Sequence, residues 1–229
     1  MKPYLSSLLL SAGFSLLLVS CDSGTARKIA SFADLPAPPA DTLSDWSGVP
    51  RGLHASFVST DAVFKRSVAP DVVPSASARL EGWRGERVSA QLLLWTASGA
   101  DGVEVEVGPF KSDGYTLPGD AAQARFVRYV LSDEFGNKCG YHDPAISPPH
   151  LVPDMLDDID VFDIEARNVR PVWITVSVPA DAPAGEYVST VKLYAKGRQL
   201  RTFDIGLTVI GRELPPPAEW NYYLDLWQH

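Results

Sequence analysis

Residues 170–195 read RPVWITVSVPADAPAGEYVSTVKLYA, and this stretch decides the fold class. Between Val172 and Val178, valine and isoleucine alternate with tryptophan, threonine and serine, a period of two that is typical of a strand with one buried face. The letters PADAPAG interrupt this run. Because Pro183 fixes φ and Gly185 can adopt a positive φ, we expect a connection between strands there. A second alternating run follows, and its link is longer than a tight hairpin, so the two strands need not be neighbours.

The same alternation recurs along the chain and predicts an all-β fold. A third long strand is expected at 203–209. Shorter runs lie at 53–58, 86–96, 103–107 and 125–131. No stretch shows a sustained helical period, and each strand has one apolar face that a second sheet usually covers in an all-β chain. We therefore expect an antiparallel two-sheet β-sandwich of about eight to ten strands over residues 51–214.

Residues 1–20 have the pattern of a lipoprotein signal peptide. Lys2 supplies a positive charge, and the apolar run at 8–19 has signal-peptide length but is too short to span a membrane. The run ends in LVSC, and small residues directly before a cysteine resemble a bacterial lipobox. The resemblance implies cleavage before Cys21 and attachment of lipid to that residue. An ordinary signal peptide that ends near a cysteine is the alternative. With lipid on Cys21, the protein is expected in the cell envelope, on the periplasmic face or at the cell surface.

Two segments are expected to flank the sandwich. Residues 21–50 contain the letters PAPPA and little periodicity, which is typical of a flexible tether. Residues 215–229 begin with three prolines, which cannot donate hydrogen bonds to a sheet, and end in the letters WNYYLDLWQH. We interpret them as a linker and the truncated first strand of a following domain. Three aromatic side chains are candidates for contact with that domain or with a glycan: Trp220, Tyr222 and Trp227.

Charge and cysteine content disfavour some partners and modifications. The 229 residues carry a net charge of −8, which becomes −9 when residues 1–20 and their one lysine are removed. Such a surface repels nucleic acid and anionic lipid head groups, so membrane attachment would depend on acyl chains at Cys21. The other cysteine, Cys139, then has no intramolecular disulfide partner, and we expect it to be a buried apolar residue rather than a reactive one.

One acidic stretch is the candidate metal site. Residues 154–160 read DMLDDID, and four carboxylates there are candidate Ca²⁺ ligands: Asp154, Asp157, Asp158 and Asp160. The spacing does not match an EF-hand loop, because Phe162 occupies a ligand position and no glycine follows. A solvated acidic loop is the favoured interpretation, and a calcium site of another kind is the alternative.

Other residue patterns predict neither a cofactor nor a nucleophile. The histidines lack the paired spacing of zinc ligands: His54, His142, His150 and His229. No GxSxG letters mark a serine nucleophile. Trp95 and Trp173 lie in the middle of predicted strands, and we expect them to pack in the core or against another domain rather than to stack on sugar rings.

Four motifs occur in an order that resembles a known family. They are GERVSAQ (85–91), PHLVPD (149–154), PVWI followed by VPADAPAGEY (171–187) and LDLWQH (224–229). Together they resemble the N-terminal β-sandwich of glycoside hydrolase family 123 and its relatives, many of which are lipoproteins of gut Bacteroidetes. The resemblance covers residues 50–229, and the order of the motifs and the aromatic ending carry it.

The resemblance implies a two-part enzyme in which the sandwich precedes a (β/α)₈ catalytic barrel. The implied activity is removal of terminal β-linked N-acetylgalactosamine by a substrate-assisted mechanism. In that mechanism the acetamido group of the sugar attacks, while an Asp–Glu pair orients it and donates a proton. That pair belongs to the barrel. The Asp133-Glu134 dipeptide lies in the predicted sandwich, so we assign no catalytic residue to this chain.

Three functions from different classes remain. The leading hypothesis is a non-catalytic domain of a lipid-anchored glycosidase, with the catalytic barrel of the same polypeptide as its partner and the glycan as an indirect one. The second is a free-standing carbohydrate-binding or adhesin-like surface sandwich. The third, and least favoured, is an enzyme in its own right. Continuation of the gene past His229 into alternating strands and helices would favour the first over the second.

Overall fold

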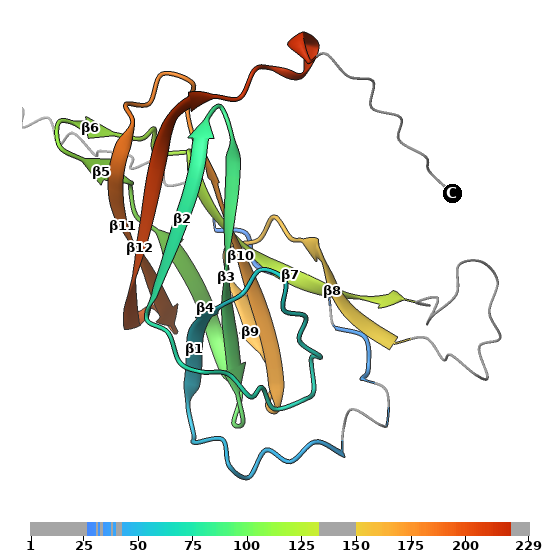
Figure 1. Cartoon of the computed structure of the whole chain (residues 1–229). Coiled ribbons are helices and arrows are strands. Elements are labelled where there is room, and N and C mark those ends of the chain that lie inside the picture. The colour runs from blue at the N-terminus through green and yellow to red at the C-terminus, as the bar shows by residue number, and fades with distance from the viewer. Residues whose placement is uncertain are drawn as a thin grey trace, which may run out of the picture.

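A computed structural model describes residues 27–30, 32, 34–37, 39, 43–132 and 150–220 (Figure 1). Its regular structure is almost entirely strand. The strands are β1 (Leu53–Val58), β2 (Ser77–Arg84), β3 (Arg87–Thr96), β4 (Ala100–Val107), β5 (Lys111–Ser112), β6 (Tyr115–Thr116), β7 (Ala122–Ser132), β8 (His150–Leu156), β9 (Phe162–Ile164), β10 (Asn168–Ser177), β11 (Gly185–Ala195) and β12 (Arg198–Glu213). A short 3-10 helix, η2 (Pro217–Glu219), follows. In the described residues no helix is long and apolar enough to cross a membrane.

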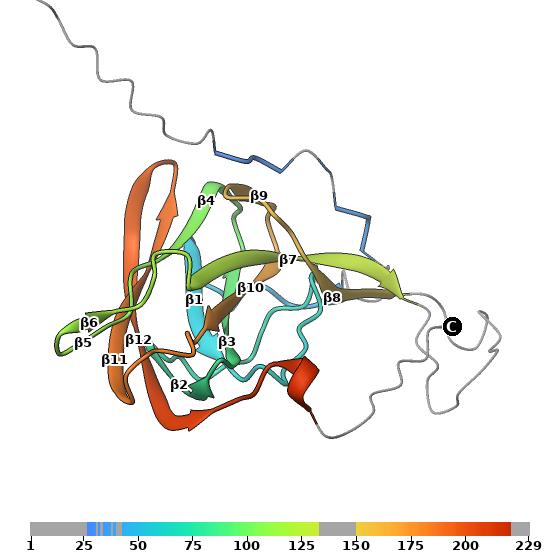
Figure 2. The ribbon, with the colours of Figure 1, turned by 90° about the horizontal axis from the view of Figure 1, so that it is seen from above.

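The strands form two sheets that pack face to face, which confirms the predicted sandwich (Figure 2). The five-stranded sheet has the order β1-β3-β10-β7-β8. The seven-stranded sheet has the order β2-β12-β11-β4-β9 and includes the short β5–β6 hairpin beside β11. Because β10 and β11 belong to different sheets, the PADAPAG link crosses between layers, and Gly185 there has a φ of 144°.

One strand pair departs from the antiparallel pattern. β12 pairs with β2 in parallel, from Asp204 opposite Ser77 onward, whereas the other named strand pairs of the described residues are antiparallel. After β2 the chain turns at Gly85 and enters the other sheet as β3. β2 therefore finds its hydrogen-bonding partner in the last strand of the domain rather than in its neighbour along the chain.

The core lies between the sheets, where the alternating aliphatic residues of each strand meet. On β10 the side chains of Val172, Ile174 and Val176 are 1%, 0% and 0% exposed, as the period of two predicts. β11 and β12 contribute in the same way, for example through Val191 and Leu207. Each such side chain contributes about 1.5–3 kcal/mol through burial of apolar surface.

A second, smaller cluster covers part of the outer face of the five-stranded sheet. Trp46, Leu93 and Val169 are buried there, and residues of the segment between β1 and β2 pack against them. Loop residues cover this part of the sheet, so only the remainder of the outer face is open to solvent.

The sequence predicts a flexible tether at 21–50, but the described residues of this segment contact the sandwich. Ile29 bridges Val161, and Ala30 N donates a hydrogen bond to Val161 O at 3.2 Å. Arg27 pairs with Glu104 on β4, and Trp46 is 6% exposed. These contacts attach the described residues between 27 and 50 to the sandwich. Sequence periodicity did not indicate this packing, because each contact involves a single residue rather than a repeated face.

Candidate functional site

The open part of the outer face of the five-stranded sheet is polar. In β10 the residues that alternate with the buried aliphatics are Trp173, Thr175 and Ser177, and all three are half-buried. They point away from the core because successive side chains of a strand lie on opposite faces. Trp173 lies outside the core cluster, on this outer face, so of its two expected positions the core is wrong and packing against another domain stays a prediction.

The neighbouring strands align further polar side chains with those of β10. The cross-strand neighbours of Trp173 are Gln91 on β3 and Arg125 on β7. Thr175 lies between Ser89 and Gln123, and Ser177 lies opposite Arg87. Three adjacent strands thus present rows of polar groups on one rigid surface.

This surface is concave and forms a hollow of about 690 Å³, which we call the β10 hollow. It is lined by Arg87, Ser89, Gln123, Arg125, Trp173 and Thr175 of the sheet, which we call its floor, and, among others, by Pro118, Asp120, Leu156 and Pro179. The volume falls in the range of about 300–1,000 Å³ that is usual for ligand sites. An aromatic ring among hydrogen-bonding side chains suits a polar ligand that has one apolar face.

The charges of the β10 hollow differ from those of the whole chain. Two guanidinium groups, Arg87 and Arg125, stand against one carboxylate, Asp120, although the chain has a net charge of −8. Arg125 Nη2 donates a hydrogen bond to Gln123 Oε1 at 3.1 Å. Among the described residues no carboxylate forms an ion pair with either arginine. The residues that line the hollow thus carry two positive charges and one negative charge on an acidic protein, although Asp158 lies near enough for the charge of Arg125 to help lower its pKa.

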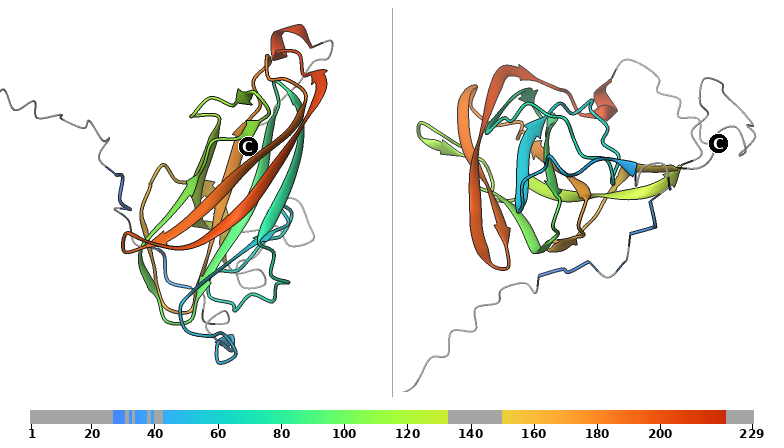
Figure 3. Two further views of the ribbon diagram at one scale, coloured as in Figure 1. Left: turned by 90° about the vertical axis from the view of Figure 1, so that its left-hand side faces the viewer. Right: turned by 90° about the horizontal axis from the view of Figure 1, so that it is seen from below.

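The chain leaves the sandwich beside this hollow. Leu214 N donates to Arg84 O at 2.8 Å, which fixes the end of β12 to the turn between β2 and β3. The same turn binds the end of β10 through Gly85 N to Val178 O (2.9 Å) and Val178 N to Glu86 O (2.8 Å). Val178 lines the hollow, and η2 lies at this end of the sandwich (Figure 3).

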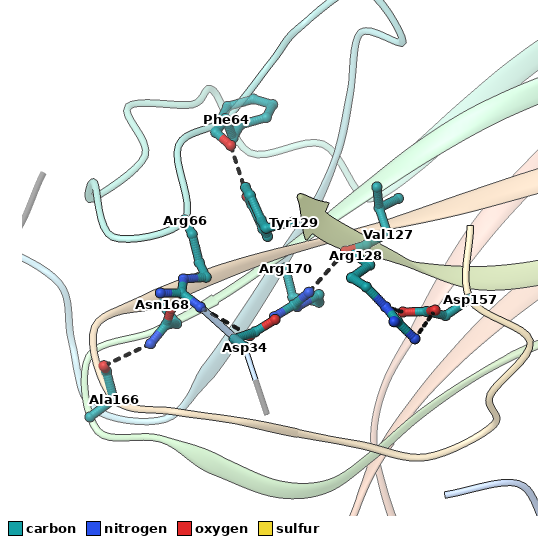
Figure 4. Close-up of polar contacts among 10 residues, drawn as sticks. All are labelled: Asp34, Phe64, Arg66, Val127, Arg128, Tyr129, Asp157, Ala166, Asn168 and Arg170. Carbon is teal, nitrogen blue, oxygen red and sulfur yellow. Dashed lines mark hydrogen bonds and ion pairs between the residues drawn. The ribbon is translucent and has the colours of Figure 1, made fainter. Parts of the chain in front are cut away.

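A buried charged cluster holds the N-terminal segment against the opposite end of β10 (Figure 4). Asp34 contacts Arg170, which is 1% exposed, and its Oδ2 lies 3.4 Å from Arg66 Nη1. Arg170 Nη1 also donates to Val127 O at 2.9 Å, and its guanidinium lies 4.2 Å from the centre of the Phe162 ring. Burial lowers the pKa of Arg170, and the Asp34 carboxylate opposes that shift.

Tyr129 on β7 closes the cluster. Its hydroxyl donates a hydrogen bond to Phe64 O at 2.8 Å, and burial raises the pKa of its phenol. The cluster joins residues from the N-terminal segment, the segment after β1, β7 and β10. Among the described residues, Asp34 is the one carboxylate that pairs with its arginines, and Asp34 and Arg66 also line a hollow of about 440 Å³. The contacts of the cluster hold these segments together.

The four aspartates of the candidate calcium site do not converge. Asp157 is buried and pairs with Arg128 at 2.6 Å, while Lys28 binds both Asp158, through its ammonium, and Asp160, through its backbone N–H at 2.8 Å. The hydrogen bond and charge of Lys28 lower the pKa of Asp158. Asp154 is exposed at the end of β8. In the part of the chain that the structure describes, no group of three or more His, Cys, Asp or Glu residues could hold a metal ion.

The remaining candidate residues are distributed along the chain. His54 stacks on Trp95 at 5.6 Å, and Trp95 packs against the second cluster. Trp220 Nε1 donates to Pro215 O at 2.7 Å. His150 is half-buried at the start of β8. The others lie outside the described residues: Cys21, Asp133, Glu134, Cys139, His142, Tyr222, Trp227 and His229. Sequence reasoning missed Arg87, Gln123 and Arg125 as members of one surface. The alternation within 86–96 and 125–131 puts Arg87 and Arg125 on outer faces, whereas Gln123 lies outside the expected strand. Only strand order brings the three together.

A family model described as the glycoside hydrolase 123 N-terminal domain matches residues 57–195, more than half of the chain. No curated protein sequence matches. Among solved structures, a family 123 glycoside hydrolase from Clostridium perfringens that hydrolyses glycolipid glycans is similar, with 20% identity and a TM-score of 0.63. The similarity covers 73% of this chain and 28% of that one. This chain thus spans little more than a quarter of the length of that enzyme.

Two other solved structures are similar at much lower scores. The N-terminal domain of PorA has 12% identity and a TM-score of 0.35, with 69% of this chain and 99% of that one covered. PapD-like domain 7 of human CEP192 has 15% identity and a TM-score of 0.33, with 68% and 99% covered. Scores this low support no inference about function.

Proposed function

Because the chain belongs to the glycoside hydrolase 123 N-terminal domain family, we propose that it is the non-catalytic N-terminal β-sandwich of a lipid-anchored glycoside hydrolase. In this proposal the chemistry belongs to a following catalytic barrel. The sandwich supports that barrel and holds it at a fixed orientation to the cell surface.

The observation that carries the proposal is the place where the chain leaves the sandwich. Leu214, the β2–β3 turn and Val178 are joined by backbone hydrogen bonds, so the exit point is tied to a residue that lines the β10 hollow. A domain that continues from η2 starts from a rigid point at this end of the molecule. Rigid attachment of this kind is what a supporting domain needs, because a flexible link would leave the two parts free to move independently.

The proposed activity of the whole protein is removal of terminal β-linked N-acetylgalactosamine with assistance from the acetamido group of the substrate. The resemblance of the sequence motifs to family 123 supports this, as does the similar Clostridium perfringens enzyme, which acts on glycolipid glycans. The proposed anchor is lipid on Cys21, which lies six positions before the first described residue, Arg27. Because the described residues from Arg27 onward contact the sandwich, the domain would stand close to the membrane.

The test compares two proteins: this chain, and the product of the gene read past codon 229. Both are incubated with a chromogenic β-N-acetylgalactosaminide. We expect hydrolysis by the longer protein and none by this chain. Turnover by this chain that survives repurification would refute the non-catalytic assignment. A gene without a barrel after codon 229 would refute the two-part enzyme.

Lipid attachment is tested separately by growth with a labelled fatty acid. We expect label on the protein and its loss in the Cys21→Ser variant. Label that persists in that variant would refute attachment at this residue.

A free-standing carbohydrate-binding protein is the second candidate. The half-buried Trp173 among hydrogen-bonding side chains favours it, since this is the composition of a sugar-binding surface. Gene continuation into a barrel, as tested above, distinguishes the two.

A further inference from the structure

We propose that the β10 hollow binds an acidic sugar residue, one that carries a carboxylate or a sulfate ester. The inference rests on the proposed function in one respect, that the ligand is a glycan. It adds the charge class of that glycan and the residues that would recognise it.

Arg87 and Arg125 provide positive charge for an anionic group of the ligand. Both line the hollow, and neither forms an ion pair with a carboxylate among the described residues. The planar guanidinium group donates paired hydrogen bonds that match the two oxygens of a carboxylate or sulfate. On a protein of net charge −8, such a patch attracts an anion that the rest of the surface repels.

Trp173 provides an aromatic face for a sugar ring. Its ring is half-buried between Gln91 and Arg125 on the neighbouring strands, so part of the ring remains available to a ligand. An indole face packs against the C–H face of a pyranose, and the position in the middle of a sheet holds the ring in place before binding. A small inorganic anion would make no use of this ring.

The residues beside Thr175 provide hydrogen-bonding groups for sugar hydroxyls. Ser89, Thr175 and Gln123 are cross-strand neighbours and supply hydroxyl and amide groups to the floor of the hollow. Sugar hydroxyls act as both donors and acceptors, which matches the side chains present. The volume of about 690 Å³ has room for more than one sugar ring.

The hollow could instead be covered by an acidic surface of the following domain. That alternative makes a different prediction for the longer protein. A covering domain would shield Trp173 from solvent and block the hollow, whereas a sugar subsite must stay open. Solvent access to Trp173 in the longer protein therefore separates the two.

The test is calorimetric titration of the purified chain with three oligosaccharides of equal length: one sialylated, one sulfated and one neutral. We expect the sialylated sugar, the sulfated sugar or both to bind at least about tenfold more tightly than the neutral one. The two acidic arms identify the anion. Binding should weaken as salt is added.

Three variants assign the binding to the hollow. Arg125→Gln and Arg87→Gln should each reduce affinity for the acidic sugar about tenfold with little effect on the neutral one. Trp173→Ala should weaken both sugars. The matched control is Arg79→Gln, an exposed arginine on the outer face of the other sheet, which should change nothing. Circular dichroism and the unfolding midpoint confirm that each variant is folded.

Several results would overturn the inference. These are equal binding of acidic and neutral sugars, no binding of either, or acidic-sugar binding that both arginine variants retain. If the longer protein binds no sugar and a soluble quencher no longer reaches the fluorescence of Trp173, the hollow is part of a domain interface. If the longer protein hydrolyses the chromogenic substrate but binds no acidic sugar, this inference is wrong and the proposed function is retained.

Discussion

Arg170 on β10 is neutralised by Asp34, a carboxylate 136 residues away along the chain. The same carboxylate oxygen lies 3.4 Å from Arg66, so one aspartate serves two buried guanidinium groups. Arg66 and Arg170 are 5% and 1% exposed, and both would be costly to bury without a counter-ion. The N-terminal segment is therefore a part of the folded domain at this point, and its removal would affect the sandwich itself.

The first prediction concerns Asp34. Substitution Asp34→Ala leaves two buried arginines without a carboxylate, so we expect the free energy of unfolding to fall by about 3–5 kcal/mol. Urea denaturation measures it. The matched control is Asp61→Ala, since Asp61 is exposed, and its cost should stay within about 0.5 kcal/mol. Equal stability of the two variants would show that the cluster does not hold the segment.

The second prediction concerns pH and Tyr129. Burial raises the pKa of this phenol above its unfolded value of about 10, so the neutral form stabilises the fold. That contribution is fully present below about pH 10 and is lost as the pH rises toward the folded-state pKa. Above pH 10 the stability of the native protein should fall more steeply than that of Tyr129→Phe, by up to about 1.4 kcal/mol per pH unit. Parallel stability curves, measured by urea denaturation at each pH, would contradict a buried neutral phenol.

The third prediction compares two valines on β11. Val191 is 0% exposed in the core, whereas Val188 is 67% exposed on the outer face. We expect Val191→Ala to cost about 2–3 kcal/mol through lost burial and the remaining cavity. Val188→Ala should cost less than about 1 kcal/mol, since only strand preference changes. Thermal and urea unfolding measure both. A larger loss at Val188 would mean that its face of the sheet is covered.

The fourth prediction compares two glycines with the same backbone conformation. Gly85 and Gly114 have φ values of 80° and 79°. An alanine at either position would adopt a left-handed conformation, which costs about 1–2 kcal/mol. At Gly85 the added Cβ would also lie 3.0 Å from Leu214 O, whereas at Gly114 it meets nothing within 4 Å. Gly85→Ala should therefore be the more destabilising substitution, and it should loosen the exit of the chain. Proteolysis after residue 213 reports that loosening. Equal costs would exclude a tight contact there.

The strands could be predicted from the sequence because their signal is repeated within a few residues. From Val172 to Val176 in β10 each second residue is aliphatic and buried, and the same period of two buries one face of β11 at 187–193 and of β12 at 203–209. Strand order could not be predicted in this way. The link after β10 crosses to the other sheet, and the parallel partner of β2 is the last strand. A period of two identifies a face but does not say which distant strand will lie beside it.

Neither the charged cluster nor the β10 hollow could be predicted from the sequence, and the reason is the same for both. Asp34 lies in a segment without periodicity, and nothing in its neighbourhood marks it as the partner of Arg170. In the hollow the outward position of Trp173 follows from the alternation of β10. Its grouping with Arg87 and Arg125 depends on β3 and β7 lying on either side. Single residues brought together by topology leave no local pattern.

The parallel pairing of β2 with β12 has a consequence for how the protein is made. An edge strand formed early in synthesis has no hydrogen-bonding partner until the ribosome has delivered residues 204–213. Contacts between such distant segments require closure of a long loop, and all-β domains dominated by them fold in milliseconds to seconds rather than microseconds. During that interval the backbone groups of β2 are open to pairing with another chain, which is the usual route to aggregation. Nascent chains that stop before residue 204 should therefore need a chaperone, and those that include β12 should not.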